Sequence, residues 1–161
     1  MPTYARDTQV PSDRSRAEIE QTLRRWGADQ FLYAWDERQA VIEFRMRGKR
    51  VRFVLPLPDP TSDDFLRTPT RRWERSNAEA EKAYEQAVRQ RWRALALVVK
   101  AKLEAVESNI VTFEAEFLAH IVLPDNRTVG QWAVPQVEGS YLTGQLPPLL
   151  PGLPPARENT E

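Results

Sequence analysis

Residues 31–55, FLYAWDERQAVIEFRMRGKRVRFVL, determine the fold that we expect for this chain. Apolar side chains alternate with others through Phe31–Trp35, Ile42–Met46 and Val51–Leu55, and a period of two is typical of half-buried β-strands. The short segments DER and GK supply turns between them. Because parallel strands need long crossovers, connections this short predict a three-stranded antiparallel meander.

A short helix precedes the strands. The pattern Ser15-x-x-Glu18 is that of a capping box, and apolar residues follow it at helical spacing as far as Trp26. Gly27 suits the left-handed conformation that commonly ends a helix. We therefore expect a helix over residues 16–26.

A much longer helix follows the strands. Residues 56–75 are rich in Pro, Asp, Thr and Arg and predict a connecting loop. Ser76-x-x-Glu79 is a second capping box, and an apolar residue then recurs every three or four positions until Ser108. The members of this stripe are Tyr84, Val88, Trp92, Leu95, Val99, Leu103 and Val106. The densest apolar run, residues 94–99, is too short to cross a membrane, so we expect it in a core.

Smaller helices and a tail complete the expected fold. Thr112 caps a short helix that stops by Pro124, and Thr128 or Pro135 begins a last short piece before Gly144. Five prolines in residues 146–161 predict an extended tail. The expectation is a single α+β domain over residues 1–145: a short N-terminal helix, the meander, a long helix packed on the sheet and small C-terminal helices, followed by the Pro-rich tail.

Composition restricts the chemistry. The 161 residues hold 23 Lys and Arg, 23 Asp and Glu, no Cys and one His. Thiol nucleophiles, disulfides and multi-His metal centres are therefore excluded within one chain, and no phosphate-binding glycine motif occurs. We expect no cofactor, no metal site and no catalytic residue, no membrane segment, and a cytoplasmic location. His120, four residues after Glu116, is either a hydrogen-bonded structural residue or half of a metal or proton-transfer site.

A basic hairpin is the strongest charge feature. Five basic residues lie within residues 45–52, and three more arginines flank a tryptophan in the following loop. We predict a nucleic-acid-binding surface from Arg45, Arg47, Lys49, Arg50, Arg52, Arg71, Arg72, Trp73 and Arg75. Clustered cations hold phosphates, and an aromatic ring stacks on a base. The alternative is a solvated sheet face whose charges pair with Glu43 or with acids on the helices.

An acidic segment and the tryptophans add further expectations. Residues 103–126 carry five carboxylates and no Lys or Arg, which indicates either a solvated surface or a docking site for a basic partner. Trp26, Trp35 and Trp92 fit apolar stripes and are expected in the core. Trp73 is either a stacking residue or an interface anchor, or it packs beneath the long helix.

Five short segments carry a resemblance. They are KAKLEAVE at 100–107, TFEAEFLAHIVLPD at 112–125, TVG at 128–130, YARDT at 4–8 and SRAEI at 15–19. In these the chain resembles an uncharacterised family of small proteins encoded by tailed bacteriophages and prophages, over most of residues 1–152. The resemblance implies an accessory phage protein in the host-cell cytoplasm and supplies no activity or catalytic residue.

The order helix, three antiparallel strands, helix is also similar to the double-stranded-RNA-binding domain. The chain departs from that module at the start of its long helix, where SNAEAE at 76–81 is acidic instead of lysine-rich, and its preceding loop is longer. Only topology is therefore shared. Two function classes follow: a non-enzymatic accessory protein that contacts DNA or RNA through the basic hairpin, or a protein–protein interaction module that inhibits or recruits a host or phage enzyme.

Overall fold

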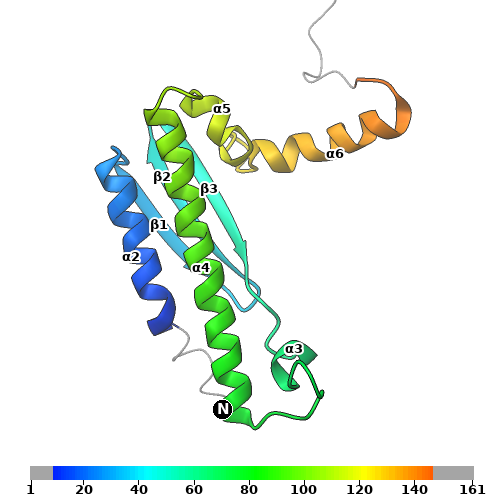
Figure 1. Ribbon diagram of the computed structural model, residues 1–161. Helices are drawn as coiled ribbons and strands as arrows, with labels where there is room; N and C mark the ends of the chain where they lie inside the picture. The colour runs from blue at the N-terminus through cyan, green and yellow to red at the C-terminus, as the bar shows by residue number, and fades with distance from the viewer. Residues whose placement is uncertain (1–8, 147–161) are drawn as a thin grey trace, which may run out of the picture.

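A three-stranded sheet with helices on one side forms the body of the protein (Figure 1). The computed structural model describes residues 9–146. Its elements are α2 Gln9–Arg25, β1 Gln30–Trp35, β2 Gln39–Met46, β3 Lys49–Pro56, α3 Asp63–Leu66, α4 Asn77–Glu107, α5 Phe113–Phe117, the 3₁₀ helix η1 Leu118–His120, and α6 Val129–Thr143. The α+β fold is confirmed. The expected tail lies outside the described residues except for Leu146.

The sheet is the predicted antiparallel meander in the order β1-β2-β3. In its register Leu32 lies beside Glu43 and Glu43 beside Arg52. The β2–β3 turn consists of Arg47 and Gly48, whose φ angles of 50° and 74° are those of a tight hairpin turn with both central residues left-handed. Lys49, which we had expected in this turn, is the first residue of β3.

The core lies between the sheet and the helices α2 and α4, which cover the same side of the sheet in Figure 1. Side chains pointing inward from the strands meet one stripe from each helix, and α5 closes one end. The most deeply buried large residues are Ile19, Leu23, Ile42, Phe44, Val51, Trp92, Val99, Leu103, Phe113 and Phe117. On the opposite face of the sheet, Leu32 and Val54 stay exposed.

The first helix is longer than predicted. It begins at Gln9 instead of residue 16, so Ser15 lies inside the helix and is not its N-cap. Its end agrees with the prediction, since Gly27 follows with a φ of 97°. Burial of Ile19 and Leu23 is also as expected.

Two expectations about burial were wrong. Trp35 stands at the exposed end of edge strand β1 and is 42% exposed, although Trp92 is fully buried and Trp26 partly so. The apolar run 94–99 is divided by the helix: Leu95 and Val99 face the core, whereas Leu97 and Val98 point to solvent. A run of six apolar residues covers every side of an α-helix, so one packing face cannot bury them all.

The helices α4, α5 and α6 begin at residues whose side chains were predicted as N-caps. Ser76 and Thr128 both form capping boxes, and Thr112 caps α5. Thr128, and not Pro135, therefore begins the last helix, and Pro135 lies within it. The segment 56–75 is not simply a loop, because it contains α3 and a β-bridge between Arg67 and Glu74.

Candidate interaction surfaces

Glu43, on strand β2, binds two arginines of the basic hairpin. Its two carboxylate oxygens accept hydrogen bonds from Arg50 Nε at 2.6 Å and Arg52 Nε at 2.8 Å. The side chains of Glu43 and Arg52 are only 14% and 16% exposed. Partial burial raises the pKa of the Glu43 carboxyl, but the hydrogen bonds from the two arginines outweigh it and hold that pKa below its usual value. Two of the five hairpin cations thus share one acid on the neighbouring strand, which offsets one of their two positive charges.

The same two arginines reach across to the C-terminal part of the chain. Arg52 donates to the backbone oxygen and the side-chain Oδ1 of Asn126, and Arg50 also donates to that Oδ1. Asn126 stands in a turn with a φ of 69°. These guanidinium groups therefore fix the segment that leads into α6 against the outer edge of β3.

The three other hairpin cations also have partners. Arg45 forms a two-point ion pair with Asp29, and Lys49 Nζ lies 3.0 Å from Glu114 Oε1. Hydrogen bonds from Arg45 and from Lys49 lower the pKa of the Asp29 and Glu114 carboxyls respectively. Arg47, at the turn, places its guanidinium over the ring of Phe113. These pairs are exposed and solvent-screened, so each contributes little stability.

The acidic segment 103–126 lies beside the basic hairpin. Glu114 pairs with Lys49, Glu116 with Lys102, and Val51 forms a β-bridge with Ile121. The two oppositely charged regions of the sequence thus partly neutralise each other at one end of the molecule. Arg50 and Arg52 pair with Glu43, and Lys49 pairs with the helical acid Glu114, as the alternative to nucleic-acid binding expected. Arg45 pairs instead with Asp29, which precedes β1.

The arginine loop 71–75 lies at the other end of the sheet. Strand β3 begins at the hairpin turn next to α5 and ends toward α3, beside the start of α4 (Figure 1). Eight strand residues span about 25 Å, so the loop does not extend the hairpin surface. Arg72 pairs with Asp63, and Arg75 donates to the backbone oxygens of Asp64 and Phe65.

Trp73 is 63% exposed, with the guanidinium of Arg71 over its ring. It is therefore not packed beneath the long helix, which was one of the two alternatives for this residue. The nine residues predicted as one nucleic-acid-binding surface form two separate clusters, and only the smaller one carries an exposed aromatic ring.

The side chain of His120 packs against an aromatic residue of the core. Its ring stacks on Phe53 with a centroid distance of 4.1 Å. Burial, aided by the charge of Lys102, lowers the pKa of the imidazole, while a hydrogen bond with the Arg52 backbone and the nearby Glu116 act in the opposite direction. Among residues 9–146 no three His, Asp or Glu side chains come together as a metal site.

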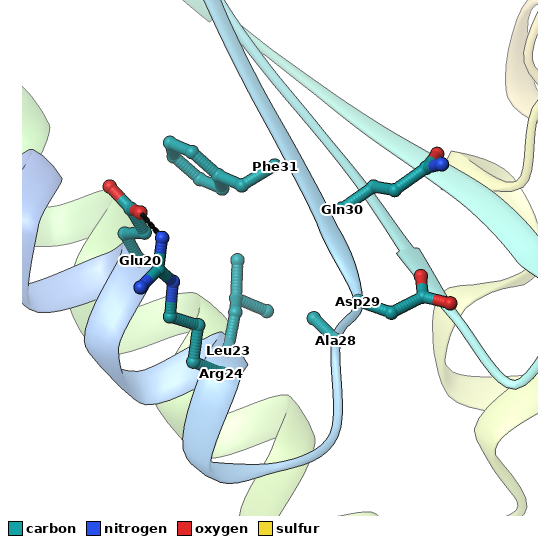
Figure 2. Close-up of a pocket in the computed structure, with 7 residues that line it drawn as sticks. All are labelled: Glu20, Leu23, Arg24, Ala28, Asp29, Gln30 and Phe31. Atoms are coloured by element: carbon teal, nitrogen blue, oxygen red, sulfur yellow. Dashed lines mark ion pairs between the residues drawn. The ribbon is translucent and has the colours of Figure 1, made fainter.

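A shallow pocket of about 290 Å³ lies between the end of α2 and the start of β1 (Figure 2). Leu23 and Phe31 face it, and its charged residues are engaged already: Glu20 pairs with Arg24, and Asp29 with Arg45. In Figure 2 Asp29 and Gln30 point away from the Glu20–Arg24 pair. The polar side chains that line the pocket do not point toward a common centre, as those of a ligand-binding site would.

Helix α6 was expected from the sequence as a short last helix, but the exposure of its apolar side chains was not. It extends away from the body in Figure 1 and contacts chiefly η1. None of its residues is buried; Val134 and Val137 are about half exposed, and Tyr141 and Leu142 are 87% and 88% exposed. The signal was present in the sequence, because Glu138 is the only charged residue among its fifteen.

Comparisons with known proteins give no relative: the chain matches no protein-family model, no curated protein and no solved structure. Within the described part of the chain, no helix has both the length and the apolar character needed to cross a membrane.

Proposed function

We propose that this protein is a non-enzymatic protein–protein interaction module that docks a partner through helix α6. Of the two function classes that the sequence allowed, this one has the better support. Four of the five cations of the basic hairpin pair with Glu43, Asp29 or Glu114. Helix α6, in contrast, exposes the apolar side chains of Val134, Val137, Tyr141 and Leu142.

The energetics of α6 carry the proposal. A soluble helix normally gains its stability by burying an apolar face, and a fifteen-residue helix is marginal without one. Pro135 adds a cost, because it removes one backbone hydrogen bond within the helix. Since the body of the protein only partly covers the first turns of α6 and leaves Val134, Val137 and Tyr141 exposed, a further stabilising contact is expected on another molecule.

The spacing on α6 defines the chemistry of the partner. Val134, Val137 and Tyr141 stand at positions i, i+3 and i+7 and therefore share one side of the helix. Side chains at this spacing are how an amphipathic helix fills an apolar groove. Glu138 lies between them on the same side, so the groove is expected to carry a basic group or hydrogen-bond donor at its rim.

The sequence resemblance suggests where to look for this partner. We propose an accessory role in the cytoplasm of a host cell, with a phage or host enzyme as the molecule that α6 inhibits or recruits. No catalytic residue or cofactor of this chain is part of the proposal.

Partner capture with matched variants tests it. The full chain and a Val137→Ser/Tyr141→Ser variant are used as baits in extracts of phage-infected cells, with Leu32→Ser/Val54→Ser as a control that removes exposed apolar groups from the sheet. A captured protein must bind the purified wild-type chain and the control, and lose at least about tenfold in affinity for the α6 variant. Equal binding to all three would overturn the role of α6.

A further inference from the structure

Helix α4 has a second apolar side, opposite the core. Leu97 and Val98 are 62% and 45% exposed, and Ala94 and Ala101 are exposed on either side of them. These four residues stand at positions i, i+3, i+4 and i+7, and we call them the outer stripe. In Figure 1 no described element crosses in front of α4.

The outer stripe is symmetric about its own midpoint. Two large residues, Leu97 and Val98, occupy the centre, and an alanine stands three positions beyond each of them. If two copies pack antiparallel about this midpoint, Leu97 meets Val98 and Ala94 meets Ala101, so the small ends allow close approach of the helices. A surface that matches itself in this way is what a two-fold dimer interface requires.

We propose that the outer stripe of α4 packs against the outer stripe of a second copy of this chain, with the two helices antiparallel. The proposal goes beyond the docking role of α6 and does not depend on it. It makes the protein a dimer that presents two α6 helices, which raises avidity for any partner with two sites.

One pair of opposite charges beside the outer stripe fits the antiparallel arrangement. Arg93 and Glu104 are eleven residues apart, about three turns, so both lie on the same side of the outer stripe. Both are exposed, and no ion pair among the described residues engages either of them. In the antiparallel pair Arg93 comes within about two residues, or 3 Å along the axis, of Glu104 of the second copy.

The molecular mass in solution is the first test. Light scattering and sedimentation velocity across a wide concentration range are expected to show a species of twice 18.6 kDa. Leu97→Glu is expected to weaken dimerisation by at least about tenfold, because it places a charge at the centre of the interface. Because Leu97 is exposed in the single chain, the helical circular dichroism spectrum of the folded variant should be unchanged.

Matched variants distinguish the outer stripe from other apolar surfaces. Leu32→Glu, at a comparably exposed position on the sheet, and the α6 variant Val137→Ser/Tyr141→Ser are both expected to remain dimeric. A wild-type chain that is monomeric throughout, or a dimer that Leu97→Glu leaves intact, would overturn the proposal. Loss of the dimer in the α6 variant would overturn it as well, and would leave the docking role of α6 to be judged by partner capture.

Disulfide trapping tests the direction of the helices, and the chain is suited to it because it contains no cysteine. Ala94→Cys alone is not expected to cross-link, since its two copies would lie about 10 Å apart along the antiparallel axes. Ala94→Cys combined with Ala101→Cys is expected to give a covalent dimer. Efficient cross-linking of Ala94→Cys alone would indicate parallel helices and contradict the proposed interface.

Discussion

Lys49 Nζ lies 3.0 Å from Glu114 Oε1, although 65 residues separate them in the sequence. This contact joins the turn end of the basic hairpin to the acidic segment, and Arg50 and Arg52 join the same parts of the chain through Asn126. Part of the basic charge of the hairpin is therefore offset by acids from other parts of the chain at this end of the molecule.

Glu43→Gln should destabilise the protein. The amide keeps the size of the side chain but removes the charge that serves Arg50 and Arg52, and Arg52 is mostly buried. Leaving a part-buried guanidinium without its counter-charge is expected to cost about 1–3 kcal/mol. Urea unfolding measures it. Asp29→Asn, which disturbs an exposed and solvent-screened pair, serves as the control and is expected to change stability much less.

Nucleic-acid binding by the wild-type chain should be weak at physiological salt, because Arg45, Arg50 and Arg52 already have anionic partners. Glu43→Gln frees two of them and is expected to increase binding at low salt, with a steep loss as salt rises. Gel-shift titrations with single- and double-stranded DNA and RNA at two salt concentrations measure this. Tight wild-type binding abolished by Arg50→Glu would show instead that the hairpin is a nucleic-acid site.

Loss of equivalent capping boxes should have different consequences at α4 and α6. Ser76→Ala and Thr128→Ala each remove an N-cap oxygen, at a cost of about 1 kcal/mol to the helix. Because α4 forms much of the core, Ser76→Ala should lower the melting temperature. Thr128→Ala should chiefly reduce amide-exchange protection in α6, which is attached at one end. Equal losses of global stability would contradict the peripheral position of α6.

Two glycines of α6 provide a matched pair. A Cβ on Gly130 would meet the backbone oxygen of Ala119 at 2.9 Å, whereas a Cβ on Gly139 would meet nothing within 4 Å. Gly130→Ala should therefore disturb the junction of α6 with η1. Gly139→Ala should stabilise the helix by roughly 0.5–1 kcal/mol. Chemical shifts of the η1 amides and the helical circular dichroism signal distinguish the two effects.

His120 should make the protein less stable as pH falls. Its pKa is lower in the folded state than in the unfolded chain, chiefly because of burial. Its contribution to stability is therefore complete above the unfolded pKa and is lost as the pH falls through that value toward the folded one. Denaturation between about pH 7 and pH 5 measures the effect. His120→Gln should flatten this part of the profile; an unchanged profile would mean that another group titrates there.

The sequence by itself determined the elements whose causes are local. Alternation defined the three strands, and the side chains of Ser76 and Thr112 defined where α4 and α5 begin, since a cap bonds within its own first turn. For α6 the sequence left Thr128 and Pro135 as alternatives, and the structure shows Thr128 as the cap. Periodicity also identified the buried side of α4 from Tyr84 to Leu103. In the basic hairpin, the alternation of the strands placed Arg45 and Arg52 on the face of the sheet opposite the core.

Only the tertiary structure decided which charges and which apolar groups remain available. Glu43 reaches its two arginines because of strand register, and Glu114 and Asn126 reach the hairpin from 65 to 76 residues away. Exposure of Leu97 and Tyr141 depends on which side of each helix another element covers. Spacing shows which side chains share a face, but burial and ion pairing depend on what the rest of the chain places against that face.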